Sequence, residues 1–218
     1  MNLFFLQDAN NFLGIEIIKY FSNDNRVFLL ENVGEKFDKN VTILKNIENV
    51  VDFFDKENIF LFGLKFLNEY DIDDISYIDN IIFDLTQKYQ FLQFISKNLI
   101  ERSFKGAFYF FTFHSINLNT SKLPIKPIHD SAIEIFVKTV SKELTTFNIY
   151  SYCLRLESIF ETMNFQEIRD FRKKMNIFAF RKTPTKILDI LSFLNVLFHN
   201  NFKLLSGSII NVGDGMDF

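Results

Sequence analysis

Short apolar runs alternate along this chain with longer segments in which apolar residues recur at helical spacing. A short run bounded by turn-forming residues is typical of a buried strand, whereas the recurring spacing is typical of a helix that packs on a sheet. Strands that alternate with helices favour an α/β protein with a mainly parallel sheet. The 218 residues suffice for one core, so we expect a single domain with a three-layer, Rossmann-like, doubly wound parallel sheet.

The same pattern divides the chain into expected elements. We expect strands at Asn2–Leu6, Arg26–Leu30, Asn58–Phe62, Ile78–Phe83, Gly106–Phe113 and Asn148–Leu156, followed by a closing strand within Leu205–Phe218. We expect helices at Gly14–Phe21, near Ile47–Lys56, and at Gln87–Arg102, Asp130–Phe147 and Pro184–Phe198, the last with Thr183 as its N-cap. Because Gly106–Phe113 is almost continuously apolar, it should lie in the centre of the sheet.

The charge and cysteine content exclude several classes of protein. The chain mixes 24 basic with 27 acidic residues along its length, so it offers no basic stripe to nucleic acid or to an anionic membrane. No apolar run reaches the roughly 18 residues that a membrane span needs, and the N-terminus lacks the basic region of a signal peptide. The single cysteine, Cys153, and the 3 histidines show no metal-ligand spacing. We expect a cytoplasmic protein without a nucleic-acid partner, a membrane partner or a metal.

Two motifs near the C-terminus lie in register with a known pattern. The segment RKTPTKILDILSFL, from Arg181, resembles R-x-x-x-P-x-E-I-A-x-x-V-x-F-L of the short-chain dehydrogenase/reductase (SDR) family, and SGSIINVGDGM follows at the family's usual distance. The segment SAIEIFVKTVSKELTTFNIYSYCL, from Ser131, is similar to the family's ALxxFTRSLAKELAPxGIRVNxV. The resemblance covers most of the chain and leans towards the 3-oxoacyl carrier-protein reductases. It implies a Rossmann fold that holds NAD(H) or NADP(H), with catalysis by a Ser, a Tyr and a Lys.

The catalytic positions of that family hold unsuitable residues in this chain. The family's Tyr-x-x-x-Lys falls on Lys126 and Asp130, and its Ser falls on or beside Phe113. The family's Tyr is an acid whose pKa a neighbouring ammonium lowers, whereas a carboxylate at that place would act in the opposite direction. The resemblance therefore implies vestigial positions and no intact catalytic residue.

Two groups of residues could substitute for the missing catalytic set. His114 and Ser115 follow the expected strand Gly106–Phe113, at the carboxyl edge of the sheet where α/β active sites usually lie. His129 with Asp130 and Lys126 could form an acid/base cluster at the start of a helix. Each group also has a plain structural explanation, as ordinary loop residues in the first case and as a helix cap in the second.

The nucleotide-binding loop of the family is also altered. The family's TGxxxGIG lies over Gln7–Gly14, where Gly14 alone remains of its glycines. Asp8 and Phe12 replace the glycines that supply a tight turn and let the pyrophosphate approach bare backbone, so a ring and a negative charge stand where phosphate belongs. Glu31, at the end of the second strand, still favours a cofactor, since an acid there can bind the ribose 2′-OH of adenosine. We expect no cofactor, or NAD(H) or NADP(H) if the loop is rearranged.

A further motif of the family suggests a deletion. The family's NNAG, which follows its fourth strand, aligns with Phe83–Thr86, and the segment from there to the next strand is shorter than usual. We therefore expect the domain to be shortened between its fourth and fifth strands, with part of the helix beneath the cofactor site removed.

The first hypothesis for function is a pseudoenzyme. In it, the chain is an SDR-like structural or regulatory subunit that has lost cofactor binding and catalysis. It pairs with its own copies or with an active SDR through the helices Asp130–Phe147 and Pro184–Phe198 and the C-terminal strand, because these blocks remain recognisable while the catalytic set does not.

Two other hypotheses stay open. The chain could be a divergent NAD(P)-dependent oxidoreductase of the ketoreductase type, with His114, His129 or Tyr152 as its acid. Alternatively, its cleft could bind a small acyl or sugar ligand without turnover, through the aromatic and basic side chains of Ser158–Lys182.

Overall fold

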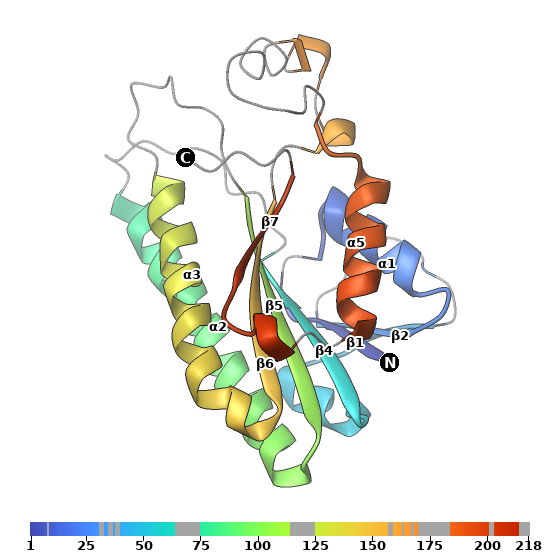
Figure 1. The fold of residues 1–218 in the computed structure, drawn as a ribbon, viewed down its shortest axis with the longest axis vertical. Coiled ribbons are helices and arrows are strands. Elements are labelled where there is room, and N and C mark those ends of the chain that lie inside the picture. Colours follow the sequence, from blue (N-terminus) through green and yellow to red (C-terminus); the bar gives the residue numbers. More distant parts are fainter. Residues whose placement is uncertain are drawn as a thin grey trace.

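Seven parallel strands form one sheet in the computed structural model, with helices on both of its faces (Figure 1). The strands are β1 (Asn2–Phe5), β2 (Arg26–Leu29), β3 (Val41–Ile43), β4 (Glu57–Phe62), β5 (Lys105–Phe113), β6 (Ile149–Leu156) and β7 (Ile209–Val212). Their order across the sheet is β3-β2-β1-β4-β5-β6-β7, and all neighbouring pairs are parallel. The chain reverses its direction of travel across the sheet between β1 and β4, so the topological switch point lies there.

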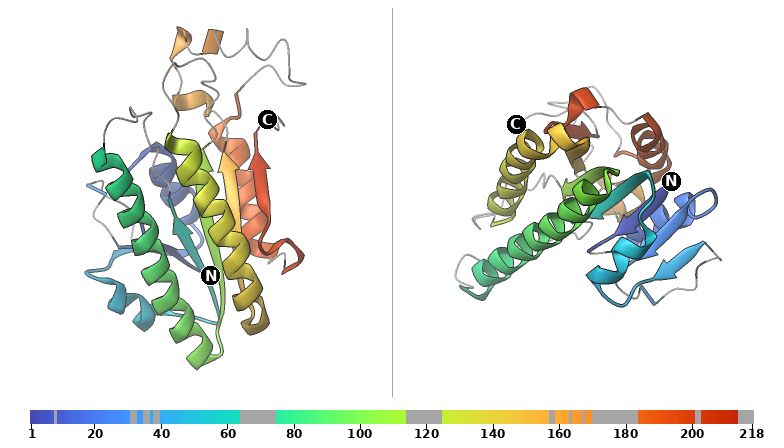
Figure 2. Two further views of the ribbon diagram at one scale, coloured as in Figure 1. Left: turned by 90° about the vertical axis from the view of Figure 1, so that its left-hand side faces the viewer. Right: turned by 90° about the horizontal axis from the view of Figure 1, so that it is seen from below.

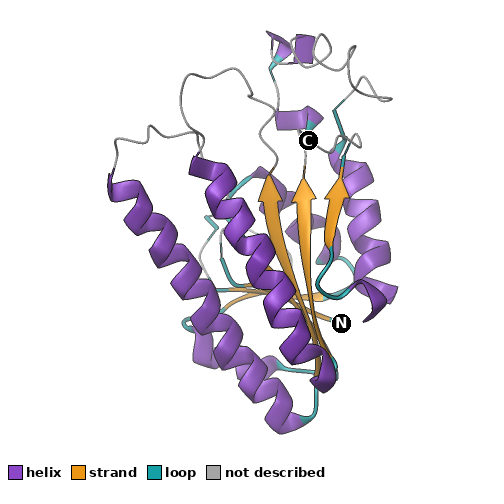
Figure 3. Ribbon diagram, turned by 60° about the vertical axis from the view of Figure 1, so that its left-hand side comes forward, coloured by secondary structure: helices purple, strands orange, loops and turns teal. Residues whose placement is uncertain are grey.

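Two helical layers cover the sheet. The helices α1 (Phe12–Phe21) and α5 (Ile187–Asn200) pack on one face, and α2 (Ile75–Arg102) and α3 (Ile125–Leu144) pack on the other (Figure 2). Short 3-10 helices complete the fold, namely η1 (Ile47–Phe53), η2 (Thr145–Phe147), η3 (Phe160–Thr162) and η4 (Lys203–Leu205). Figure 3 shows α2 and α3 side by side, with both helices starting at the carboxyl edge of the sheet. The expected three-layer, doubly wound parallel sheet in one domain is thus confirmed.

The structure describes most of the chain. The described residues are 1–7, 9–30, 33–34, 37, 40–63, 75–113, 125–156, 159–162, 164–166, 168–169, 184–200 and 203–213, with the backbone alone at 75–78, 80, 113 and 125–128. Within these ranges, no helix is long and apolar enough to cross a membrane.

A row of phenylalanine rings crosses the sheet on the α2/α3 face. Phe28, Phe4, Phe60 and Phe108 lie directly opposite one another on β2, β1, β4 and β5. Their rings stack with centroid distances of 4.8, 5.1 and 5.0 Å along the row. Stacked rings of this kind bury large apolar areas and fix the register of neighbouring strands. These four of the chain's 30 phenylalanines therefore serve the core, and Gly106–Phe113 lies within β5, an interior strand of the sheet, as expected.

One expected strand is wrong. Ile78–Phe83 lies inside α2, and the helix runs without a break to Arg102. Six residues are too few to distinguish a strand from a helix by their spacing, whereas the residues that follow, with Leu92, Ile95 and Leu99 buried on one side, continue a helical stripe back through them. The alignment of NNAG with Phe83–Thr86 assumed a strand before Phe83, so this alignment is wrong as well. The shortening between the fourth and fifth strands, which was derived from the same alignment, stays a prediction.

The last helix begins later than expected. Pro184 is not helical, and α5 starts at Ile187. Thr185 instead pairs with Ile159 in an isolated parallel bridge, and the N–H of Phe160 donates to its carbonyl over 3.0 Å. The carboxylate of Glu161 accepts the N–H of Ile187 over 3.0 Å and so caps the helix. The expected cap, Thr183, lies outside the described residues, and a distant segment supplies a cap that local sequence could not reveal.

Candidate functional site

The switch point between β1 and β4 is the natural place for a ligand in this fold. In open α/β sheets, ligands bind in the crevice outside the carboxyl ends of the strands where the strand order reverses. Here Gln7 follows β1 and leads into α1, while Gly63 follows β4 on the side that leads to α2. The side chains that border this crevice therefore decide what the protein can hold.

A hydrogen bond joins the two sides of the crevice. The side-chain amide of Gln7 donates to the side-chain carbonyl of Gln87 on α2 over 2.6 Å. Gln7 is only 8% exposed, and its own side-chain carbonyl oxygen has no hydrogen-bond partner. The side-chain amides of Gln7 and Gln87 therefore bridge the crevice at the carboxyl ends of the strands.

The N-terminus of α1 is occupied by the preceding loop. The side chain of Asn11 accepts the N–H of Gly14 over 3.0 Å, so Asn11 is the N-cap and Phe12 is the first helical residue. Phe12 is 37% exposed. A Cβ added to Gly14 would lie 2.3 Å from the carbonyl oxygen of Ala9, so this glycine is needed for close packing whether or not a cofactor binds. Asp8 lies outside the described residues.

A polar cluster lies between α2 and α3 near the carboxyl edge of the sheet. His129 Nε2 is 2.9 Å from Asp84 Oδ2, and His129 Nδ1 is 3.5 Å from Asp130 Oδ1. The ammonium of Lys88 pairs with the second oxygen of Asp84. Lys88 is 1% exposed and His129 is 6% exposed. A Cβ on Gly63 would lie 3.5 Å from the Cε of Lys88, which places this cluster beneath the end of β4.

The pKa values of the cluster reflect mutual stabilisation. Burial by itself would raise the pKa of the Asp84 carboxyl, but its hydrogen bond with His129 and its ion pair with Lys88 hold that pKa below the ordinary value. Burial by itself would lower the pKa of His129, but the contacts with Asp130 and Asp84 raise it above the ordinary value. The contacts of this cluster therefore favour the protonated form of His129 and the ionised form of Asp84.

This arrangement limits the chemistry that His129 can perform. Each of its ring nitrogens faces a carboxylate, so the protonated ring has no nitrogen left for a substrate. A general base needs a free nitrogen within hydrogen-bond reach of the proton that it removes. The cluster is a closed, charge-balanced network that ties α2 to α3.

The structure brings together only part of the expected acid/base cluster. His129 and Asp130 do lie in contact, but the side chain of Lys126 is not described. Asp84 and Lys88 complete the network, and sequence reasoning missed both because it placed Asp84 at the end of a strand. Their spacing of four residues, within a long apolar stretch of one helix, is the signal that could have revealed a buried ion pair.

The remaining expected site residues are dispersed or not described. Phe113 ends β5, with only its backbone described, and His114, Ser115 and Glu31 lie outside the described residues, as does most of Ser158–Lys182. Tyr152 was expected as a possible acid, and this is wrong. It is fully buried, it stacks on Tyr109 at 4.9 Å in the core on the α1/α5 face, and burial raises the pKa of its hydroxyl.

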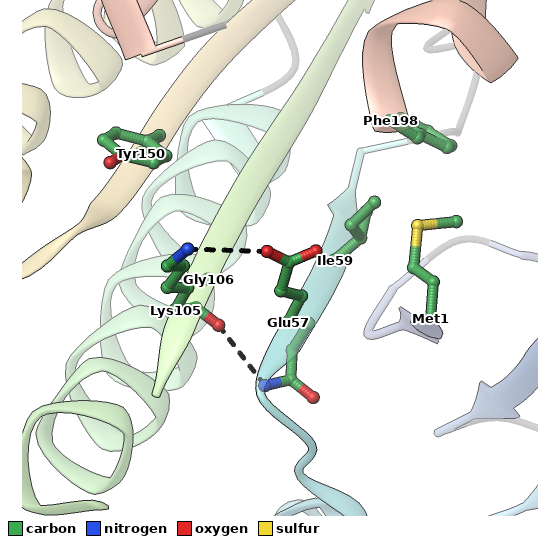
Figure 4. A pocket seen from close by; sticks show the side chains of 8 residues that line it. Met1, Glu57, Ile59, Lys105, Gly106, Tyr150 and Phe198 are labelled. Carbon is green, nitrogen blue, oxygen red and sulfur yellow. Dashed lines mark hydrogen bonds and ion pairs between the residues drawn. The ribbon is translucent and has the colours of Figure 1, made fainter. Parts of the chain in front are cut away.

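A small pocket at the opposite edge of the sheet is too small for a substrate. It lies among Met1, Glu57, Lys105, Tyr150 and Phe198 at the amino ends of β4 and β5, and the carboxylate of Glu57 is 3.5 Å from the ammonium of Lys105 (Figure 4). Its volume of about 10 Å³ is close to the space of a single water molecule. Within the described part of the chain, no group of three or more His, Cys, Asp or Glu residues could hold a metal ion.

Comparisons with known proteins identify the fold. No model of a protein family matches the chain, and no curated protein matches it. A 4-hydroxyisoleucine dehydrogenase complexed with NADH is 15% identical, with 99% of this chain and 98% of that one covered and a TM-score of 0.76. A short-chain dehydrogenase from Leptospira borgpetersenii with bound NAD+ is 14% identical over 98% and 91%, with a TM-score of 0.77. A halohydrin dehalogenase bound to ethyl (2S)-oxiran-2-ylacetate is 12% identical over 100% and 98%, with a TM-score of 0.79.

Proposed function

Because the chain has the fold of the short-chain dehydrogenase/reductases, we propose that it is a catalytically degenerate SDR-like protein, a pseudoenzyme that serves as a structural or regulatory subunit. It assembles with its own copies or with an active SDR. The observation that carries this proposal is the hydrogen bond between Gln7 and Gln87 across the crevice at the switch point.

The crevice supports the loss of cofactor binding. A dinucleotide needs bare backbone and free N–H groups where its pyrophosphate meets the first helix. In this chain Asn11 takes the N–H of Gly14, Phe12 stands at the first helical position, and the Gln7–Gln87 bond crosses the space above the strands. A cofactor would have to break these interactions.

The former catalytic positions support the loss of catalysis. Asp130, at the place of the family's Lys, contacts His129, and His129 in turn contacts Asp84. The side chains of Asp130, His129 and Asp84 therefore serve as hydrogen-bond partners for one another inside the protein. A network of this kind stabilises the packing of two helices, whereas a working site presents an unsatisfied group to its substrate.

The outer face of α2 supports a role in assembly. Between Asn80 and Ser96 the chain has two charged residues, Asp84 and Lys88, which pair with each other. Ile82, Phe83 and Tyr89 are each half or more exposed on the same turns of the helix, and Ile135 is similarly exposed on α3. The cores of protein–protein interfaces are depleted in charge and rich in aromatic residues. We call Ile82, Phe83 and Tyr89 of α2, together with Ile135 of α3, the subunit surface, which adds residues of α2 to the expected surface on α3.

Cofactor titration is the decisive experiment. The purified protein is titrated with NADH and NADPH by calorimetry, and its melting temperature is measured at the highest concentration of each. We expect no heat of binding at millimolar cofactor and no change in melting temperature. A cofactor present at a hundred times its dissociation constant would stabilise the fold by about 2.7 kcal/mol, an effect that is easily measured. A dissociation constant in the micromolar range would refute the proposal.

Assembly is tested with a charge placed on the subunit surface. Phe83→Asp should weaken self-association at least about tenfold in analytical ultracentrifugation, because the charge would be desolvated in the interface. Tyr20→Asp adds the same charge on α1, on the other side of the sheet, and should leave association unchanged. A wild-type protein that is monomeric at micromolar concentration and captures no partner from a lysate would remove the support for a subunit role.

A divergent NAD(P)-dependent oxidoreductase is the second candidate. Two observations favour it: the fold neighbours named above hold NADH and NAD+, and His129 lies near the carboxyl edge of the sheet. In this case the Gln7–Gln87 bond would open on binding, and His129 would exchange its carboxylate contact for a substrate. Micromolar binding of NADH or NADPH, together with oxidation of NADH by a ketone substrate, would distinguish this candidate from the first.

A further inference from the structure

His129 lies between carboxylates that belong to different helices. Asp130 is its neighbour on α3, whereas Asp84 reaches it from α2, 45 positions away along the chain. The ammonium of Lys88, four residues after Asp84, neutralises the far side of the Asp84 carboxylate. Among the described residues of this cluster, Asp84 and His129 each contact ionisable groups of both helices, so the contact between these two side chains joins α2 to α3.

The charged side chains that are described on the neighbouring strands do not contact this cluster. Arg155 of β6 faces α3, but its guanidinium pairs with Glu134, with the Nε of Arg155 3.0 Å from a carboxylate oxygen. On β5, the residues from Gly106 to Thr112 are uncharged. Within the described residues, the charged groups that act on His129 are thus Asp84 and Lys88 from α2 and Asp130 from α3. With His129 protonated, two positive and two negative groups balance.

We propose that the cluster of Asp84, Lys88, His129 and Asp130 is a pH-sensitive link, which holds the first half of α2 against α3 while His129 is protonated and releases it when that proton is lost. Loss of the proton leaves a nitrogen lone pair facing a carboxylate oxygen and gives the buried cluster a net negative charge.

The direction of the pH dependence follows from the two pKa shifts. The pKa of His129 is raised by its contacts with Asp130 and Asp84, which outweigh the opposing effect of burial, so the link is complete below about 6.5 and weakens as the pH rises towards the raised pKa. The pKa of Asp84 is lowered, so the link also fails in strong acid, below the ordinary pKa of an aspartate. The link is therefore strongest in mildly acidic solution.

The link has a consequence for the subunit surface. Ile82 and Phe83 lie on the turn of α2 that holds Asp84, so release of this turn displaces the exposed apolar side chains with it. Association through this surface should then weaken at alkaline pH. This consequence, unlike the link itself, rests on the proposed function as a subunit.

Proton NMR of the imidazole rings tests the link directly. The protein has 3 histidines, and the variants His114→Gln and His199→Gln assign the remaining resonance to His129 by elimination. The titration midpoint of His129 should lie above about 6.5 in the wild type and fall in Asp84→Asn. A midpoint at or below 6.5 would overturn the proposal, even if variants of His129 itself fail to fold.

Hydrogen exchange tests whether the link holds α2. After correction for the intrinsic pH dependence of exchange, the opening constant of amides from 82 to 92 should rise up to about tenfold per pH unit above 6.5, until the midpoint of His129 is passed. In His129→Gln it should not change with pH, and amides of α5, on the other face of the sheet, should show no such rise in either protein. Equal pH dependence in the wild type and His129→Gln would overturn the proposal.

Association measured at about pH 6 and about pH 8.5 tests the regulatory consequence. The wild type should associate more weakly at the higher pH, and His129→Gln should not. If the wild type associates equally strongly at both pH values while hydrogen exchange shows that α2 opens at the higher pH, the proposed pH control of association through the subunit surface is wrong. Binding of NADH would overturn the proposed function and leave the titration of His129 unaffected, so the two failures are distinguishable.

Discussion

Gln7 and Gln87, 80 positions apart in the sequence, are joined by a hydrogen bond of 2.6 Å between their side-chain amides. One residue follows β1, and the other lies on the helix that follows β4. The bond therefore closes the protein's own crevice at the place where this fold ordinarily receives a ligand. Its contribution to stability can be measured.

Gln87→Ala should destabilise the protein by about 2 kcal/mol, because it removes the acceptor of the buried Gln7 side-chain N–H, beside a Gln7 carbonyl oxygen that already has no hydrogen-bond partner. Urea unfolding measures the loss. Gln90→Ala, on the exposed side of the same helix, should change the free energy of unfolding by less than about 0.5 kcal/mol. Similar values for the two variants would mean that the amides do not pair in solution.

Lys88→Met should cost about 2 kcal/mol, because it leaves the carboxylate of Asp84 with one partner fewer beneath the sheet. This loss of stability is smaller than the loss expected for a fully buried ion pair, since water reaches part of the Asp84 side chain. The double variant Asp84→Asn with Lys88→Met should lose less stability than the sum of the single changes. Lys97→Met, at an exposed position on α2, serves as the control and should be nearly neutral. Strict additivity of the two changes would contradict the pairing.

Gly14→Ala should destabilise the protein by about 2 kcal/mol or more in the absence of any cofactor, because the new Cβ would meet the carbonyl of Ala9. Thermal unfolding of the purified protein provides the measurement. Gly34→Ala is the control for backbone strain, since Gly34 has a φ of 74° and no described atom lies within 4 Å of a Cβ placed on it, and it should cost about 1 kcal/mol. If Gly14→Ala were neutral, the packing role of this glycine would be excluded.

Glu161→Ala should destabilise α5 by about 1 kcal/mol, because the N–H of Ile187 loses its acceptor and the helix loses a negative charge at its N-terminus. Glu143→Ala removes an exposed carboxylate from α3 and serves as the control. Hydrogen exchange of the first turn of α5 should increase in the first variant only. An unchanged rate would show that another group caps the helix.

The spacing of apolar residues along the chain was sufficient to predict most of the strands and helices. The sequence predicts a central strand at Gly106–Phe113, because a strand buried on both faces is apolar at nearly every position. It predicts a helix at Gly14–Phe21, because the apolar residues there recur at helical spacing. Such signals depend on neighbours along the chain, so they can be recognised without a structure. Ile78–Phe83 shows the limit, since so short a run fits either period.

The α/β class and the order of most strands and helices could be predicted from the sequence, and the resemblance to the SDR pattern implied that Asp8 and Phe12 stand in place of two glycines. The contacts of Gln7 with Gln87, of Asp84 with His129 and of Glu161 with Ile187 became visible in the folded protein alone. Spacing along the chain encodes which face of an element is buried, whereas a contact between distant side chains depends on how the layers of the sheet and its helices are placed against one another.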